Sequence, residues 1–340
     1  MISLAAAWPG AHAQVSACRE IRNDAERLAC YDRATEPAAP PEAGSTAADS
    51  SPGRELGSIP AEQVERRRRL GASLTDRWEL DAASTRGTFL LRPYKPMYLL
   101  PVNYTNRINS EPSSSAPGHT SATLASLDNT EAKFQISLKA KIWQNVFADN
   151  GDLWLGYTQS SRWQVYNDAD SAPFRETNYE PEAMLVFRTN YELFGLNGRL
   201  VGIGVNHQSN GRALPLSRSW NRITANFGFE HDDWMVMARP WWRMKESANQ
   251  DDNPGIENYI GRGELLVARK INGHVLSVQA RHSLRGGENS HGSVQFDWAI
   301  PVSSYLKGHL QLFSGYGESM IDFNHRQTTF GLGISLVDWF

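Results

Sequence analysis

The feature that most restricts the fold is a strand-length alternation of apolar and polar residues that recurs through most of the chain. In "FQISLKAKI", Phe134 and Ile136 belong to an apolar face, and Lys139 and Lys141 belong to the opposite, polar face. About twelve such segments occur, each near the length of a tilted strand that crosses a bilayer. The expected strands are 94–105, 132–143, 152–165, 177–192, 198–208, 218–230, 233–245, 257–271, 274–284, 292–302, 307–317 and 327–340.

The connections between these segments also follow a pattern. Short connections such as "FGLNG" and "INGH" alternate with long ones such as "SNGRALPLS" and "KESANQDDNPGI". Bacterial outer-membrane barrels have short turns at one rim and long loops at the other, and closure leaves no unpaired strand edge in lipid. We therefore expect an all-β fold, a twelve-stranded antiparallel transmembrane β-barrel. In the soluble alternatives, a β-sandwich or a lipocalin-like barrel, the apolar faces would form a core and the lysines would face water.

The composition is compatible with such a barrel and argues against a nucleic-acid partner. The net charge is −3, so the chain offers no strongly basic surface for nucleic acid. No window of about 18 apolar residues exists, which excludes a membrane-spanning helix. Eleven Trp and eleven Tyr fit the aromatic girdles of a membrane barrel, although a tryptophan-rich soluble β-protein would share this feature.

The N-terminal region differs from the rest of the chain. Residues 1–13 resemble the end of a secretory signal, with a short apolar run and the small-residue site "AHA". Residues 14–36 are expected to form a small helical segment. Residues 37–85, which begin with a Pro-, Ala- and Ser-rich stretch, are expected to be a linker. We therefore place the barrel domain at 86–340 and expect the N-terminal segment to be periplasmic.

Cys18 and Cys30 are the two cysteines of the chain. In one straight helix their Cα atoms would lie about 18 Å apart, which is too far for a disulfide. An exported chain with two cysteines is expected to pair them, so the segment would fold back as a helical hairpin. The competing interpretation, a metal or thiol site, lacks a CxxC motif or a nearby histidine cluster.

The fifth and sixth expected strands carry polar residues on their apolar face. His207 and Ser209 follow Val205 at alternate positions, and Asn221 precedes Ile223 in the same way. Because the two strands flank one long loop, we expect them to be antiparallel neighbours with these side chains clustered on the outside of the barrel. A serine nucleophile needs a base, and a histidine base needs a partner on its second ring nitrogen. The cluster therefore predicts a serine hydrolase site that faces lipid.

Five stretches of the sequence carry a resemblance to a known family. The string "NHQSNGRALPLSRSWNR" (206–222) resembles the signature of bacterial outer membrane phospholipase A. Further agreement comes from "SAPFRETNYEP" (171–181), "TQSSRWQ" (158–164), "DDNP" (251–254) and "SGYGESMIDFN" (314–324). The resemblance spans the region from about residue 89 to the C-terminus and leaves the N-terminal region uncovered.

The resemblance implies a calcium-dependent enzyme that removes acyl chains from phospholipids, with A1, A2 and lysophospholipase activities. By position, His207 resembles the general base, Ser209 the nucleophile and Asn221 the residue that orients the histidine. Gly211 matches a backbone N–H that helps to hold the oxyanion.

The resemblance also implies the ligands of a calcium ion. They are the carbonyl of Arg212, the hydroxyl of Ser217 and the carbonyl of Ser171 from a partner barrel. Asp252 matches a further carboxylate ligand of the family. The family's monomeric calcium site has a second acid at the position of Leu214, so a separate site of that kind is left open here.

The family is active as a homodimer, and Gln159 matches a polar residue at its dimer interface. An unpaired amide in lipid is unfavourable, which favours pairing across a two-fold axis, although Gln159 could also lie in the head-group zone. Two alternatives to the phospholipase hypothesis are a non-catalytic outer-membrane barrel and a deacylase of another lipid such as lipid A. All of these hypotheses place the protein in the bacterial outer membrane.

Overall fold

The computed structural model describes residues 73–340, except residues 122, 125, 304 and 305, together with Asn23, Glu26, Arg27 and Cys30. The chain divides into two compact units, residues 1–58 and 59–340. The signal-like segment lies outside the described residues, and so does Cys18, so its pairing with Cys30 stays a prediction. Among the described residues, no helix is long and apolar enough to cross a membrane.

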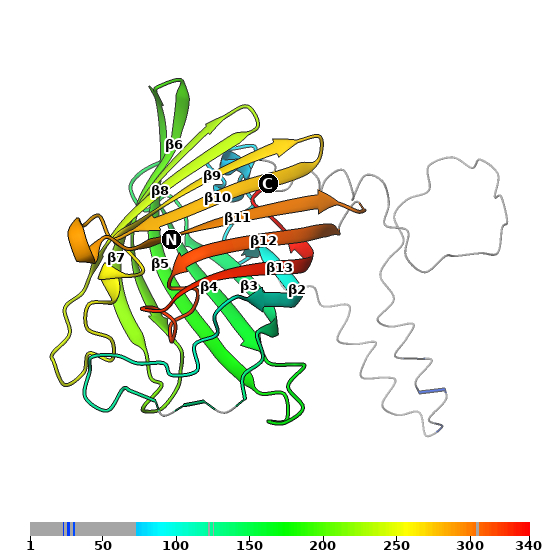
Figure 1. Ribbon diagram of the computed structural model, residues 1–340. Helices are drawn as coiled ribbons and strands as arrows, with labels where there is room; N and C mark the ends of the chain where they lie inside the picture. Colours follow the sequence, from blue (N-terminus) through cyan, green and yellow to red (C-terminus); the bar gives the residue numbers. More distant parts are fainter. Residues whose placement is uncertain are drawn as a thin grey trace, which may run out of the picture. The chain divides into compact units, whose positions relative to one another are not determined.

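The described part of the second unit consists of antiparallel strands, one α-helix and two short 3-10 helices (Figure 1). Its elements are α4 (Leu74–Trp78), β1 (Leu91–Pro93), β2 (Met97–Thr105), β3 (Thr130–Trp143), β4 (Asp152–Trp163), β5 (Phe174–Leu193), β6 (Leu196–Ser209), β7 (Ser219–His231), β8 (Trp234–Arg243), η1 (Ile256–Asn258), β9 (Gly263–Ile271), β10 (His274–His282), η2 (Gly287–Asn289), β11 (Gly292–Pro301), β12 (Lys307–Tyr316) and β13 (Arg326–Val337).

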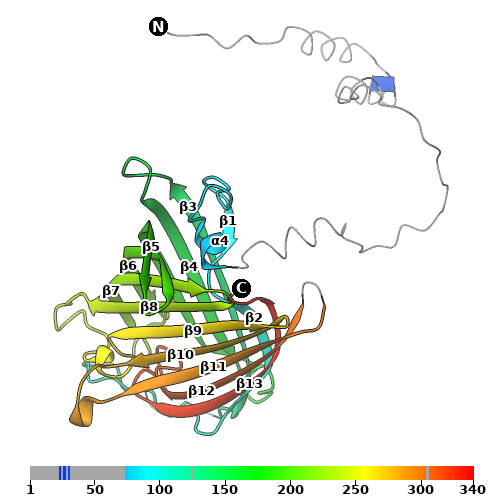
Figure 2. The ribbon, with the colours of Figure 1, turned by 90° about the horizontal axis from the view of Figure 1, so that it is seen from above.

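Strands β2 to β13 close into a twelve-stranded barrel, which confirms the predicted fold (Figures 1 and 2). Each strand pairs antiparallel with its sequence neighbours, and β13 returns to β2 through pairs such as Thr329 with Thr105. Strand β1 is an additional short strand that pairs with β3. The connection between the seventh and eighth barrel strands is longer than expected, because the sequence predicts that the eighth strand begins at residue 257. Residues 256–258 form η1 after Gly255, whose φ of 75° breaks the extended chain, so β9 begins at Gly263.

Tight turns and long loops lie at opposite ends of the barrel (Figure 1). Strands β5 and β6 are joined by Phe194 and Gly195, whose φ angles are 52° and 79°. Asn272 and Gly273, between β9 and β10, have φ angles of 50° and 83°. Two successive residues in the left-handed region match the hairpin turn whose twist fits antiparallel strands. The sequence therefore sets the strand register at this rim through local turn chemistry.

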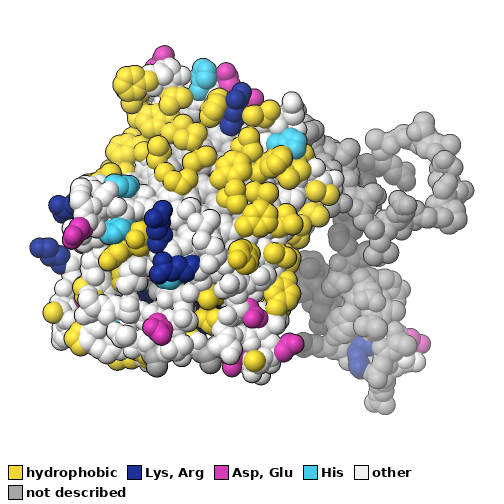
Figure 3. Space-filling model, in the orientation of Figure 1, with side chains coloured by type: hydrophobic (Ala, Val, Ile, Leu, Met, Phe, Trp, Pro, Cys, Tyr) yellow, Lys and Arg dark blue, Asp and Glu magenta, His cyan; other side chains and the backbone are white. Residues whose placement is uncertain are grey.

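The polarity of the barrel is the inverse of a soluble β-protein. Lys139 and Lys141 point inward and are 2% and 1% exposed, whereas the outward Ile136 is 47% exposed. The amine of Lys141 forms ion pairs inside the barrel with Asp152 at 2.7 Å and with Glu79 at 3.2 Å. Apolar side chains gather in a broad patch on the outer surface (Figure 3). An apolar exterior over a charged, paired interior is the arrangement of a transmembrane barrel, so the soluble alternatives are wrong.

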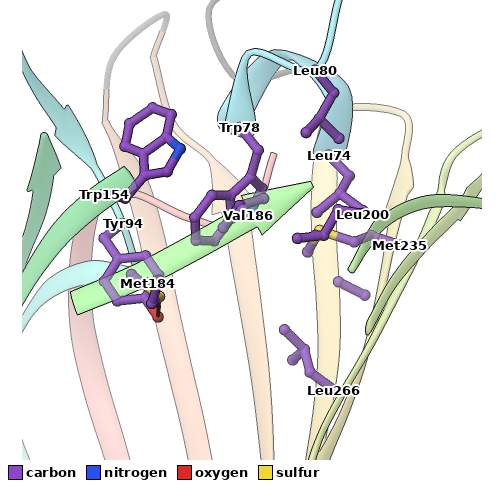
Figure 4. Packing of buried hydrophobic residues seen from close by; sticks show 11 residues of the cluster. Leu74, Trp78, Leu80, Tyr94, Trp154, Met184, Val186, Leu200, Met235 and Leu266 are labelled. Atoms are coloured by element: carbon purple, nitrogen blue, oxygen red, sulfur yellow. Dashed lines mark hydrogen bonds between the residues drawn. The ribbon is translucent and has the colours of Figure 1, made fainter. Parts of the chain in front are cut away.

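Helix α4 packs against residues of the barrel strands, and one of its side chains contacts the C-terminal end of the chain. Ser73 caps the helix by accepting a hydrogen bond from the backbone N–H of Asp76 at 3.0 Å. Trp78 points from the helix toward Tyr94 and Trp154, with ring centroids 5.8 and 5.7 Å away in edge-to-face contacts (Figure 4). The buried cluster around it comprises Leu74, Trp78, Leu80, Tyr94, Trp154, Met184, Val186, Leu200, Met235, Leu266 and Ala268.

Residues 74–80 therefore belong with the barrel and not with a linker, which corrects the boundary expected at residue 86. The guanidinium of Arg77 donates to the backbone carbonyl of Asp338 at 3.0 Å and to that of Tyr94 at 2.7 Å. These contacts tie the helix to both ends of the barrel sequence. The sequence of this segment, "LTDRWEL", does not show that it belongs to the barrel, because it lacks the alternation of a strand. Its burial depends on the interior of the closed barrel, which is formed by distant parts of the chain.

Candidate active site

Strands β6 and β7 bring the three predicted catalytic residues to one place on the outer face. His207 lies directly opposite Asn221, and Ser209 lies opposite Ser219, where the two strands meet the loop 210–218. Ile203 and Val205, which share the face of His207, are 56% and 55% exposed, so this face is the outer surface of the barrel. The predicted alignment of an apolar face with a polar cluster near the long-loop rim is present in the structure.

His207 and Asn221 form a direct side-chain hydrogen bond. The Nδ1 atom of His207 lies 2.8 Å from Oδ1 of Asn221. Because an amide oxygen can only accept, this contact assigns the proton to Nδ1 and leaves Nε2 as the free base. The other amide atom of Asn221, Nδ2, donates to Oε1 of Glu246 at 3.0 Å. All three side chains are half-buried.

Ser209 points to the same side of β6 as His207, two positions further along the strand. Its cross-strand neighbour on β5 is Tyr179, whose ring packs against Gly211. A Cβ placed on Gly211 would lie 3.1 Å from that ring, and the φ of Gly211 is 62°. The close approach of the ring and the positive φ both favour glycine at this position, two residues after Ser209. Within the described residues, the side chain of His207 forms one hydrogen bond, to Asn221, and none to Ser209.

The loop 210–218 has a fixed internal framework. The side chain of Asn210 accepts from the backbone N–H of Arg218 at 3.0 Å and from that of Arg212 at 3.3 Å. Arg218 donates to the carbonyls of Ser217 at 2.7 Å and His119 at 3.1 Å. Burial lowers the pKa of the Arg218 guanidinium, and the nearby carboxylates of Glu176 and Asp252 oppose that shift. The framework positions the Arg212 backbone and the Ser217 side chain.

Asp252, in the loop between β8 and β9, contacts the end of the loop 210–218 through its carboxylate. The hydroxyl of Ser217 donates to Asp252 Oδ2 at 2.7 Å, and the hydroxyl of Ser219 lies 3.3 Å from the same oxygen. His119, from the loop 106–129, holds Oδ1 of Asp252 at 3.1 Å through Nε2. The structure thus brings Ser217 and Asp252 together.

This donor set suits a hard cation. Hydroxyl, carboxylate and carbonyl oxygens are the ligands that Ca²⁺ takes, and Ser217 and Asp252 supply the first two kinds in direct contact with each other. The Arg212 carbonyl, from the same loop as Ser217, is the expected third ligand. Leu214 is 63% exposed and contributes no acid. Among the described residues no cluster of three or more His, Cys, Asp or Glu could hold a metal ion, so a calcium site here would need hydroxyl and carbonyl ligands in addition to Asp252.

Ser171 and Gln159 lie apart from this cluster within one chain. Ser171 is exposed in the connection between β4 and β5, with a φ of 58°. Gln159 lies on the outer face of β4, where its Oε1 accepts a hydrogen bond from Tyr157 at 3.1 Å. No hydrogen bond or ion pair joins either residue to Ser217 or Asp252 in the part of the chain that the structure describes. Within one chain, therefore, neither residue bonds to this cluster.

Sequence reasoning missed two residues that contact the predicted site, His119 and Glu246. Each lies in a long loop, outside any alternating segment, and reaches the site only because of how the loop folds. Their polar character alone gave no signal, since long loops of this chain contain many polar residues.

Known proteins share this architecture and this stretch of sequence. The sequence profile of the family described as phospholipase A1 matches residues 74–336. The chain is an outer-membrane member of the phospholipase A1 family. A putative phospholipase A1 of Neisseria meningitidis serogroup B is 35% identical over an alignment of 348 positions, which covers 94% of this chain and 90% of that protein.

Solved structures of family members agree with the fold. Outer membrane phospholipase A from Escherichia coli, both unmodified and as an active-site mutant in which an asparagine is replaced by alanine, superposes with a TM-score of 0.69 at 34% identity. The match covers 80% of this chain and the whole of that one. The Salmonella typhi dimer with bound calcium superposes with a TM-score of 0.69 at 35% identity, covering 79% and 99% of the two chains. Phospholipase A1 enzymes are ester hydrolases, and this phospholipase A1 family barrel belongs in the outer membrane.

Proposed function

We propose that the chain is a calcium-dependent serine hydrolase that cleaves acyl ester bonds of membrane phospholipids through His207, Ser209 and Asn221. The observation that carries the proposal is the His207–Asn221 hydrogen bond on the outer face of the barrel, directly beside Ser209. The E. coli relative, whose active site contains an asparagine, supports the assignment of Asn221.

The geometry suggests the following reaction. His207 Nε2 takes the proton of Ser209 Oγ as that oxygen attacks the ester carbonyl carbon. The oxyanion of the tetrahedral intermediate faces the backbone N–H of Gly211. Collapse of the intermediate breaks the ester bond, and His207 returns the proton to the departing lysolipid alcohol. Water, activated in the same way, then releases the fatty acid from Ser209.

Asn221 keeps the imidazole in the required form. Its Oδ1 accepts from Nδ1–H, so Nε2 stays unprotonated in the resting enzyme. A neutral amide suits a site that faces lipid, because an aspartate in the same place would carry a larger desolvation penalty. The site opens sideways onto the membrane, so both esters of a glycerophospholipid, and the remaining ester of a lysolipid, can reach Ser209. We therefore include A1, A2 and lysophospholipase activity in the proposal.

Calcium and a second copy complete the proposed site. Ser217, Asp252 and the Arg212 carbonyl would hold the ion, and when bound it supplies positive charge near the scissile carbonyl. The proposed homodimer adds the carbonyl of Ser171 from the partner barrel and places Gln159 at the interface. Support comes from the Salmonella typhi relative, which forms a dimer with bound calcium.

The test is hydrolysis of phospholipid in mixed micelles, with calcium or with a chelator, by the wild type and Ser209→Ala. Ser314→Ala is the matched control, because Ser314 is an exposed outer-face serine on β12 whose hydroxyl hydrogen-bonds to Thr328 at 3.0 Å. We expect calcium-dependent hydrolysis by the wild type and the control and none by Ser209→Ala. Hydrolysis by Ser209→Ala near the wild-type rate would refute the site, and hydrolysis of lipid A but not of phospholipid would favour the alternative deacylase.

A further inference from the structure

The amide of Asn221 is held from both sides. Its Oδ1 faces His207 Nδ1 at 2.8 Å, and its Nδ2 donates to Glu246 Oε1 at 3.0 Å. A carboxylate can only accept, so Glu246 determines which amide atom points away from the histidine. If the amide turned over, its NH₂ group would face Nδ1 and select the tautomer with a protonated Nε2, which cannot act as the base.

Glu246 is itself fixed in place. It lies three residues beyond the end of β8, and the backbone N–H of Met244 extends the strand pairing by donating to the Asn221 carbonyl at 2.8 Å. Arg243 approaches the Glu246 carboxylate at 3.4 Å. The side chains of Glu246 and Arg243 are only 16% and 11% exposed. The carboxylate is therefore a partly buried, oriented acceptor and not a freely rotating surface acid.

We propose that Glu246 is a positioning residue for catalysis, which acts through Asn221 on the tautomer and orientation of His207. The inference rests on the proposed catalytic role of Asn221. It adds a fourth member to the proposed catalytic series of Ser209, His207 and Asn221. It also places a negative charge behind the neutral amide, where it favours the imidazolium that forms during the reaction.

A purely structural role for Glu246 is the competing explanation, since the contact could simply anchor the loop 244–262. Other residues of the loop form ion pairs with the same arginine, Arg243. Arg243 also pairs with Asp251 at 2.5 Å and with Glu257 at 3.2 Å. Replacing Glu246 therefore leaves two ion pairs between this loop and β8. Glu257→Ala removes one of these ion pairs without touching Asn221, so it is a matched control.

The first measurement is kcat and KM of purified protein on short-chain phospholipid with saturating calcium. For Glu246→Ala we expect kcat to fall about three- to tenfold, the effect of one lost hydrogen bond, with KM unchanged. Glu246→Gln should recover most of the activity, because its amide oxygen still accepts from Asn221. Glu257→Ala should match the wild type. Heat-modified gel migration of each variant checks that the barrel is folded.

The second measurement repeats Glu246→Ala in an Asn221→Ala background. If Glu246 acts through Asn221, the second substitution costs nothing further. The same loss in both backgrounds, or no loss in the wild-type background, would overturn the inference. Failure of the proposed function looks different, because Ser209→Ala and Asn221→Ala would then both remain as active as the wild type.

Discussion

At the scale of single residues, the site depends on where strand geometry places ordinary side chains. His207, Ser209 and Asn221 are on the outer face because the side chains of a strand alternate and because the register of β6 and β7 pairs 207 with 221. A shift of one residue in that register would send Asn221 to the inner face. The pairing of two strands is therefore as necessary to the site as the residue types are.

Substitution of the histidine is expected to reduce activity more than substitution of the asparagine. His207→Ala removes the base, so we expect hydrolysis to fall by at least about a hundredfold. Asn221→Ala removes only an orienting contact, so we expect a loss of about tenfold in kcat. Steady-state rates on the same micellar substrate check both values. Equal losses in the two variants would contradict the assignment of Asn221 as a secondary member.

At the scale of elements, α4 and the loop after β12 fill the barrel from opposite ends of its sequence. Trp78 of α4 packs between Tyr94 and Trp154, and the amine of Lys139 lies over its ring at 3.1 Å. Glu318 reaches inward to Arg162 at 2.9 Å and to Lys133 at 2.7 Å. Both elements place buried side chains in contact with residues of the barrel wall.

Trp78→Ala is expected to destabilise the folded barrel. The substitution leaves a cavity beside two aromatic rings and removes the cover of a buried lysine, and losses of this kind cost about 3–5 kcal/mol. Urea unfolding in lipid vesicles, followed by tryptophan fluorescence and gel migration, measures the change. An exposed tryptophan at the same end, Trp143, supplies the control Trp143→Ala. Equal stability of the two variants would show that α4 contributes nothing to the barrel.

The loop after β12 makes stability depend on pH. Burial alone would raise the pKa of Glu318, but Arg162 and Lys133 hold that pKa well below its usual range. A carboxyl with a depressed pKa contributes stability that is present above its unfolded pKa of about 4.3 and is lost as the pH falls. Glu318→Gln should therefore unfold at lower urea than the wild type at pH 7, and the difference should shrink in acid. A difference that is constant with pH would contradict the ion-pair account.

The sequence predicts the strands and their alignment, but not the helix and long loops that contact them. The strand pattern predicted the barrel and the alignment of His207, Ser209 and Asn221, because both follow from a period of two and from loop lengths. Residues 74–80 were misplaced because their burial depends on an interior that only the closed barrel creates. Glu246 and His119 were missed because long-loop conformations depend on contacts between distant segments.

At the scale of the whole molecule, the proposed site is incomplete in one chain. Ser217, Asp252 and the Arg212 carbonyl give few ligands to an ion that takes about six to eight oxygens. Ser171 is exposed and separate from them, and Gln159 lies on the outer face of β4. A partner barrel would supply what one chain lacks, which would keep a lipid-facing hydrolase inactive until two chains meet.

Calcium binding and dimerisation are therefore expected to be linked, each raising the affinity of the other by the same factor. Cross-linking and hydrolysis should rise together along one calcium titration. Ser217→Ala should shift both curves to higher calcium, whereas Ser247→Ala, at an exposed hydroxyl of the loop 244–262, should shift neither. A calcium-saturated monomer with full turnover would contradict this linkage.

The central claim is that Ser209 is the nucleophile of a site on the outer face of the barrel. The most direct measurement is covalent labelling of the folded protein in micelles with a long-chain alkyl fluorophosphonate, followed by mass spectrometry of the peptides. We expect one calcium-dependent adduct on Ser209, which is lost in Ser209→Ala, strongly slowed in His207→Ala and unchanged in Ser314→Ala. An adduct on a different residue, or labelling of Ser209 at the same rate without His207, would contradict it.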